Sequence, residues 1–331
     1  MISRLMRSFS VVWLVGAAGL RCLAAPHPPE SVPNRAYFYI HTVADLDRSA
    51  AFYRDVIGLR IKRVLAAFPS DKPTRNAQIN ALTNTPNAFF RPLYFELPGN
   101  DYGFELLEFT QIERKPLQPR LQDPGATFLI LDVRNLDAVA AKAAMTGATV
   151  VTAGGKPVIA GSPKTETNSA MRSIFLRDPD GFYLLLRQPR RIAKGAPQGQ
   201  ITGAGVGVTV ADLGKTTAFY TDLLGLVPGK AAGGASLNAL TGVSGAQIAI
   251  GSARISGSTF APEFWEFRGV DHQAIHPRMQ DPGAPQFTLQ FRLPAPARAY
   301  LKQEGLEFLS DGVFYDPNGV LILVRGEPPN H

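Results

Sequence analysis

The chain has 331 residues, of which 45% are hydrophobic and 18% charged, a composition that suits one large or two medium globular domains and excludes extensive disorder. The net charge of +7 is spread along the sequence, apart from Arg190, Arg191 and Lys194. Because nucleic-acid-binding proteins gather their basic residues on one face or segment, this spread argues against nucleic acid as a partner.

The first residues have the pattern of an export signal. Arg4 and Arg7 precede an apolar stretch, and small residues follow it. We place the cleavage after Ala24, so that residues 1–24 form a signal peptide and the mature protein is periplasmic or secreted. The apolar stretch is too short to span a bilayer and no later one is long and uncharged enough, so we expect no membrane anchor. Cys22 is the only cysteine, which leaves the mature chain without a disulfide or a thiolate metal site.

Hydrophobic periodicity predicts two cycles of strands and helices in the first half of the chain. The first cycle begins with a strand at 37–43 and a helix capped near Asp45, and further strands continue through Phe109. The second cycle consists of a strand, an Ala-rich helix that ends at Gly147, and two strands about an Asp-Pro-Asp-Gly turn, at 128–133, 135–145, 173–175 and 183–187.

The second half of the chain repeats the first. The segments that recur, in the same order, are 43–46, 80–83, 119–126 and 178–181, matched by 210–213, 238–241, 277–284 and 316–319. The chain is therefore a duplication, with a first domain at 36–187 and a second at 201–325. Residues 188–200 are rich in Pro, Gly, Arg and Lys, which is typical of a linker.

The repeated motifs resemble a known superfamily. Each half opens with a Val-x-Asp-Leu, Phe-Tyr and Gly-Leu series and has an Asp-Pro-Asp/Asn-Gly turn before its last strand. These features are similar to those of the vicinal-oxygen-chelate superfamily, which includes glyoxalases, bleomycin- and fosfomycin-resistance proteins and extradiol dioxygenases. The resemblance implies an α+β fold in which four βαβββ modules form two tandem domains, with mixed sheets curled around a cleft. It does not define the reaction, because this scaffold supports many activities.

The resemblance also implies where a divalent metal would bind, on His, Gln or Glu side chains at four strand positions of each cleft. In the two halves these positions fall on Phe38 and Gly205, Glu108 and Glu266, Phe128 and Gln286, and Leu185 and Leu323. Modules paired within each half would leave Glu108 alone and join Glu266 to Gln286, whereas modules paired across the halves would join Glu108 to Gln286. Hard divalent ions need several donors, so we expect a degenerate or absent metal centre and assign no cofactor.

Three histidines lie away from the termini, and none is at a ligand position. His41 is three residues after Phe38, so strand alternation directs it to the opposite face as a core histidine with satisfied hydrogen bonds. His272 and His276 have the i, i+4 spacing of a helical metal pair, although a solvated loop is the preferred interpretation.

The remaining candidates concern the clefts. Glu108 is expected near Phe38, Phe128 and Leu185 and paired with Arg187, as a general base or, preferentially, in a structural ion pair. Small residues at Gly205 and Gly207 leave room for a ligand or a neighbouring side chain. An insertion at 153–170 is either a lid or a disordered loop.

We interpret the chain as an exported protein that binds a small, partly apolar molecule in its clefts. The predicted ligand-binding residues are Phe38, Phe128, Leu185, Arg187, Gly205 and Leu323. One alternative is a metal-dependent lyase, isomerase or oxidoreductase of the glyoxalase or dioxygenase type that uses Glu266 and Gln286. Another is a non-catalytic structural or partner-binding protein. Both a monomer and a homodimer are compatible with the sequence.

Overall fold

The computed structural model describes residues 32–62, 69–160, 171–192, 194–229, 232–233 and 237–325. The predicted signal peptide lies outside the described residues, and so does 161–170 of the predicted insertion. In the part of the chain that is described, no helix is long and apolar enough to cross a membrane.

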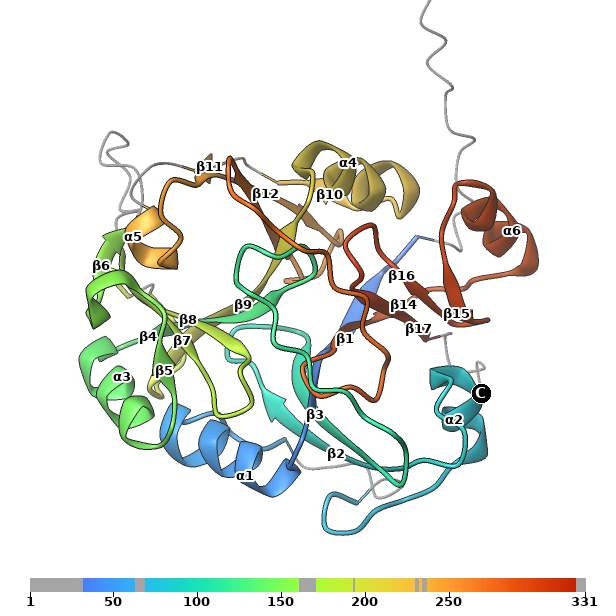
Figure 1. Ribbon diagram of the computed structural model, residues 1–331, viewed down its shortest axis with the longest axis horizontal. Coiled ribbons are helices and arrows are strands. Elements are labelled where there is room, and N and C mark those ends of the chain that lie inside the picture. The colour runs from blue at the N-terminus through green and yellow to red at the C-terminus, as the bar shows by residue number, and fades with distance from the viewer. Residues whose placement is uncertain are drawn as a thin grey trace, which may run out of the picture.

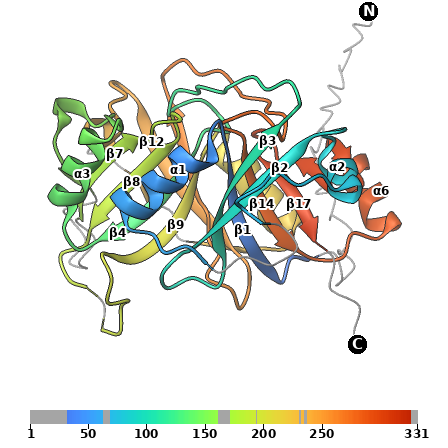
Figure 2. The same cartoon turned by 90° about the horizontal axis from the view of Figure 1, so that it is seen from below.

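Two mixed sheets form the body of the molecule (Figures 1 and 2). The seven-stranded sheet has the spatial order β15 (Phe308–Ser310), β16 (Val313–Tyr315), β17 (Leu321–Arg325), β14 (Pro285–Gln290), β1 (Arg35–Val43), β3 (Gly103–Thr110), β2 (Phe89–Glu96). The ten-stranded sheet has the order β10 (Val227–Pro228), β12 (Gln247–Arg254), β13 (Glu263–Arg268), β9 (Ile201–Val210), β4 (Thr127–Val133), β8 (Tyr183–Gln188), β7 (Met171–Arg177), β5 (Thr149–Val150), with β11 (Ala232–Gly233) on β12 and β6 (Val158–Ala160) on β7. The α+β class with two mixed sheets is as predicted, whereas a strong curl of either sheet is not confirmed.

Each sheet combines one module from each half of the chain. Strand β1 of the first module pairs antiparallel with β14 of the fourth, and β4 of the second module pairs antiparallel with β9 of the third. Of the two arrangements that the sequence left open, the structure therefore has the one in which modules pair across the halves. This pairing joins the first strands of the modules, whose edges would otherwise be exposed.

The repeated sequence motifs hold the modules of one half together. Helix α1 (Leu46–Ala51) continues into η2 (Phe52–Ile57), and α4 (Leu213–Ala218) continues into η4 (Phe219–Leu223). The Tyr53 hydroxyl of η2 donates to Asp178 Oδ2 at 2.8 Å, and the Tyr220 hydroxyl of η4 donates to Asp316 Oδ2 at 3.1 Å. The Phe-Tyr and Asp-Pro motifs thus form one contact in each half, while the strands pair across the halves.

Local capping explains where the helices begin. The backbone N–H groups of Arg48 and Lys215 donate to the side chains of Asp45 and Asp212, the N-caps of α1 and α4. Helix α3 (Leu136–Met145) is capped in the same way by Asn135, and its C-terminal turn places Gly147 at φ 95°. The other helical segments are α2 (Ala77–Thr83), η3 (Ala153–Gly155), α5 (Leu237–Thr241) and α6 (Ala295–Gln303).

The hydrophobic core has three parts. The largest joins residues of both sheets with α1, η2, α3 and η4. The other two lie on the opposite faces of the sheets: one is on the seven-stranded sheet with Ile79 and Leu82 of α2, and the other is on the ten-stranded sheet with Leu237 and Leu240 of α5. These two faces occupy equivalent positions on the two sheets.

Candidate functional site

The seven-stranded sheet holds a cavity of about 190 Å³ beneath α2, which we call cleft A. Strands β1, β3 and β14 contribute to its walls, which are mainly apolar and aromatic. Its polar residues are Thr83, Tyr94, Glu105, Gln286, Thr288 and Arg325. Because an apolar cavity of about 150 Å³ binds benzene, cleft A has the size for a molecule of one or two rings.

Glu105 is the acidic residue of cleft A. Strand alternation puts Glu105 and Leu107 on the cleft side of β3, where Glu105 is 7% exposed. Burial raises the pKa of the Glu105 carboxyl to about 8, and the nearby Arg325 guanidinium opposes this shift only in part. Among the described residues, no hydrogen bond or ion pair reaches this carboxyl. Glu105 was not among the residues predicted from the sequence, although the strand alternation that places His41 also applies to β3.

Glu108, the candidate named from the sequence, lies on the other face of β3. Its carboxylate accepts hydrogen bonds from Arg91 Nε at 2.7 Å and from the Leu46 backbone N–H at 3.3 Å, at the start of α1. The preferred interpretation as a structural ion pair is therefore correct in kind, but the predicted partner, Arg187, is wrong. The even-numbered residues of β3 face the helix, so Glu108 does not share cleft A with Phe38.

Gln286 is a second polar group of cleft A, and it is fully buried. The Thr42 hydroxyl donates to the Met279 carbonyl oxygen at 2.9 Å, so the Thr42 oxygen accepts from Gln286 Nε2 at 3.0 Å. Gln286 Nε2 also lies 3.4 Å from the Met279 carbonyl oxygen. These acceptors fix the orientation of the amide, and Gln286 Oε1 has no hydrogen-bond partner among the described residues. An unsatisfied buried acceptor costs about 1–3 kcal/mol.

The residues of cleft A do not fit the metal centre that the family implies. Glu105 and Gln286 flank Ile40 in the strand register, so their Cα atoms are two strand spacings apart, roughly 10 Å. The other two positions carry the apolar side chains of Phe38 and Leu323. Within the described ranges no group of three or more His, Cys, Asp or Glu residues is arranged to hold a metal. Two donors are too few for a hard divalent ion.

The corresponding face of the ten-stranded sheet, which we call face B, is filled by its own side chains. The rings of Phe128, Phe175 and Trp265 pack edge to face, with centroids 5.2 to 5.9 Å apart, and all three are buried. A Cβ atom added to Gly207 would lie 2.0 Å from the Phe128 ring. The room left by this glycine is therefore taken by a neighbouring side chain, one of the two alternatives predicted for it; Gly205 lies beside Ile130.

Face B also neutralises its carboxylate. Glu263 accepts a hydrogen bond from Trp265 Nε1 at 3.0 Å and forms an ion pair with Arg187 Nη1 at 3.1 Å. Arg187 Nε also contacts Asp132 Oδ1 at 2.9 Å. Glu266, a metal candidate from the sequence, lies on the opposite side of β13 and pairs with Arg268 at 2.6 Å.

Cleft A and face B are equivalent position by position. Val43 is opposite Glu108 in one sheet and Val210 is opposite Glu266 in the other, so the repeats keep the same strand register. The equivalent residues, with cleft A first, are Glu105 and Glu263, Leu107 and Trp265, Gln286 and Phe128, Val313 and Phe175, and Arg325 and Arg187. The structure thus divides the predicted ligand-binding residues between the sheets: Phe38 and Leu323 line cleft A, whereas the others belong to face B.

The histidines lie outside both sites. His41 is buried on the core side of β1 and stacks on Phe182 with centroids 4.0 Å apart, as alternation predicts. It is not a satisfied histidine, because neither ring nitrogen has a hydrogen-bond partner among the described residues; burial lowers its pKa to about 4. His272 and His276 lie in an irregular exposed loop, and His276 Nε2 is 3.4 Å from Glu307.

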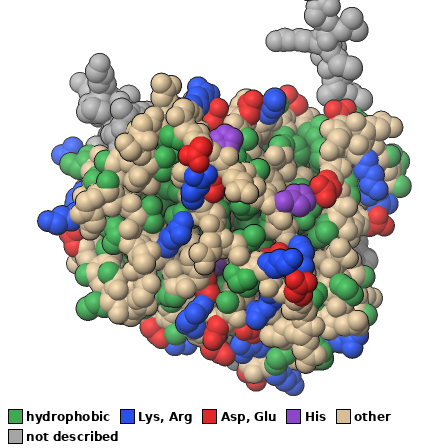
Figure 3. Space-filling model, viewed as in Figure 1, with side chains coloured by type: hydrophobic (Ala, Val, Ile, Leu, Met, Phe, Trp, Pro, Cys, Tyr) green, Lys and Arg blue, Asp and Glu red, His purple; other side chains and the backbone are tan. Residues whose placement is uncertain are grey.

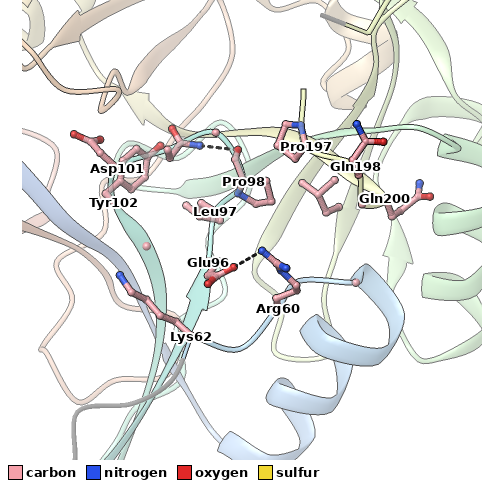
Figure 4. Close-up of a pocket in the computed structure, with 16 residues that line it drawn as sticks. Arg60, Lys62, Glu96, Leu97, Pro98, Asp101, Tyr102, Pro197, Gln198 and Gln200 are labelled. Atoms are coloured by element: carbon pink, nitrogen blue, oxygen red, sulfur yellow. Dashed lines mark hydrogen bonds and ion pairs between the residues drawn. The ribbon is translucent and has the colours of Figure 1, made fainter. Parts of the chain in front are cut away.

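Two larger cavities lie at the surface. One, of about 520 Å³, is formed by the β2–β3 turn and residues 197–201, with Arg60 directed at the Glu96 carboxylate (Figure 4). The other, of about 730 Å³, includes His276 and the turn at 316–319. In the view of Figure 3, acidic and basic side chains are interspersed and form no single charged patch. Cleft A is smaller, but it combines apolar walls with two buried acceptors, the Glu105 carboxyl and Gln286 Oε1, that have no hydrogen-bond partner in the described part of the chain.

The comparisons with known proteins agree with this fold. A family profile described as "Glyoxalase/Bleomycin resistance protein/Dioxygenase superfamily" matches residues 39–186. The structure is similar to glyoxalase I from Zea mays, with a TM-score of 0.53 and 17% identity over 88% of this chain and 91% of that chain. A mutant of that enzyme gives the same TM-score and identity over 88% and 93% of the two chains. A putative dioxygenase from Bacillus subtilis has a TM-score of 0.48 and 12% identity over 90% and 87% of the chains.

A search of curated proteins finds no significant match. The profile match defines the class of the first half: residues 39–186 match the glyoxalase, bleomycin-resistance and dioxygenase superfamily, and the chain as a whole has the fold of glyoxalase I. At 17% identity, the similarity to glyoxalase I establishes the fold and not the reaction.

Proposed function

We propose that this protein binds a small, partly apolar molecule in cleft A and does so without a metal centre of the family type. The contrast between cleft A and face B carries this proposal. Both have the same backbone register, but one encloses about 190 Å³ and the other is packed with rings. Buried polar groups without partners are costly. The Glu105 carboxyl and Gln286 Oε1, which lack partners among the described residues, are therefore better explained as groups that a ligand satisfies.

Phenol, a one-ring molecule with a polar end, is a suitable test ligand. Saturation-transfer NMR should detect its binding to the wild-type protein. The variant Leu107→Trp should abolish this binding, because it introduces the side chain that fills face B at the equivalent position. The control Trp265→Phe changes face B and should leave phenol binding intact. Binding that survives in Leu107→Trp would locate the site elsewhere and refute the proposal.

The competing function is that of a metal-dependent lyase, isomerase or oxidoreductase. In cleft A, Glu105 and Gln286 would have to supply its metal ligands. Elemental analysis of protein incubated with Mn, Fe, Ni or Zn should find no stoichiometric metal. If the wild type bound one metal ion per chain and the double variant Glu105→Ala, Gln286→Ala did not, the result would favour a metal enzyme over a metal-free binding protein.

We further propose that the protein is exported, on the basis of its N-terminal sequence pattern alone. Expression of the full chain in a Gram-negative host should give a periplasmic product whose intact mass corresponds to a start at Ala25. A cytoplasmic product that retains Met1 would contradict this proposal.

A further inference from the structure

Face B shows how this fold satisfies a carboxylate at the position of Glu105. The equivalent residue, Glu263, accepts the indole N–H of Trp265 at 3.0 Å, and the Trp265 ring packs against Phe128 and Phe175. The arginine of the same face, Arg187, completes the neutralisation at 3.1 Å. On face B, therefore, the protein itself supplies an aromatic N–H group that binds a partly buried carboxylate, whose side chain is 28% exposed.

Cleft A keeps the carboxyl group, on Glu105, but lacks these partners. Leu107 replaces the tryptophan and Val313 replaces Phe175, which removes both the N–H donor and ring volume. The equivalent arginine, Arg325, lies over the Tyr37 ring, with its guanidinium carbon 5.1 Å from the ring centroid. It forms no ion pair with Glu105 in the described structure. Because Leu107 stands where face B has the indole of Trp265, cleft A has both an open cavity and an acceptor, Glu105, without a donor among the described residues.

The remaining walls of cleft A favour a flat ring that carries hydrogen-bond donors. Phe38 and Tyr94 pack at 4.8 Å and, with Phe90, line the space with aromatic surface, against which rings pack well. Gln286 contributes a second acceptor, because its amide nitrogen is held by Thr42. Two acceptor oxygens in this cavity favour a ligand that donates hydrogen bonds.

We propose that cleft A recognises a planar aromatic molecule of one or two rings that donates an N–H group to Glu105, as Trp265 donates to Glu263 on face B. This inference rests on the proposed function and names the class of its ligand. The cavity of about 190 Å³ accommodates an indole-sized molecule.

Indole and 1-methylindole are the probes that test this inference, because they share the ring system and only indole has an N–H. Ligand-detected NMR titration should give an affinity for indole roughly tenfold higher than for 1-methylindole, the effect of one hydrogen bond to a buried acceptor. Leu107→Trp should abolish binding of both probes.

The role of Glu105 is tested by two substitutions. Glu105→Gln keeps an acceptor oxygen and should retain the preference for indole, whereas Glu105→Leu removes the acceptor and should bind both probes equally. Glu108→Gln, on the helix side of β3, should behave as the wild type. A preference that persists in Glu105→Leu would reflect the size of the methyl group and would overturn the inference.

The failure of this inference can be told apart from that of the proposed function. Equal binding of both probes to the wild type, abolished by Leu107→Trp, would overturn recognition of the N–H while cleft A remained a binding site. Absence of binding by either probe would also overturn the inference. Phenol binding would then decide the proposed function separately.

Discussion

Cleft A and face B have the same strand register, but cleft A encloses a cavity and face B is filled with side chains. The duplication placed equivalent residues on both sheets, but Trp265, Phe128 and Phe175 close one site with their own rings, whereas smaller or polar side chains leave the other open. The difference lies in a few side chains and not in the fold. The shared fold describes the scaffold, while the space available to a ligand depends on how each of the two faces is filled.

The largest expected effect concerns packing, which should matter more on face B than in cleft A. Trp265→Ala removes a buried ring from a packed cluster and should lower the free energy of unfolding by about 3–5 kcal/mol. Leu107→Ala, at the equivalent position, should cost only about 2 kcal/mol, because its side chain already borders a cavity. Urea denaturation of both variants measures the difference. Equal losses would mean that the two faces are packed alike.

The next effect concerns pH. Burial raises the pKa of Glu105 from 4.5 to about 8, so the fold favours the protonated form. Its contribution to stability is complete below about pH 4.5 and is lost as the pH rises through about 8. Glu105→Gln cannot ionise and should therefore gain roughly 2–4 kcal/mol over the wild type between pH 5 and pH 9.

Thermal unfolding of both proteins across this pH range measures the gain. Comparing them cancels the contributions of other buried acids, such as Asp178, whose pKa is also raised, to about 7. A constant difference between wild type and Glu105→Gln would show that Glu105 already has a charge partner, as Glu263 does.

The smallest effect concerns the glutamates on the helix-facing sides of the two sheets. Glu108→Gln should cost about 1–2 kcal/mol, because the carboxylate and its partner Arg91 are 9% and 14% exposed. Glu266→Gln should cost less than about 1 kcal/mol, because Arg268 is 57% exposed. Urea denaturation measures both, and neither variant should alter phenol binding. Loss of phenol binding in Glu108→Gln would show that Glu108 contributes to the binding site, contrary to its position in the structure.

Much of the fold could be predicted from the sequence, because strand periodicity, the caps at Asp45 and Asn135 and the repeated motifs are local signals. The pairing of β1 with β14 could not be predicted, since modules paired within each half and modules paired across the halves would bury the same residues. The candidate site was predicted only in part. Gln286 and Glu108 were both named at positions that the family resemblance implies. Gln286 does line cleft A, but Glu108 was named in place of Glu105 because its position was not checked against the alternation of β3.

The most direct test of the contrast between the two faces is a crystal of the protein under xenon pressure, since xenon enters empty apolar cavities without needing a polar contact. The predicted result is an anomalous peak in cleft A beside Leu107 and none among the rings of Trp265, Phe128 and Phe175. A cleft A without xenon, or equal occupancy on both faces, would contradict the account.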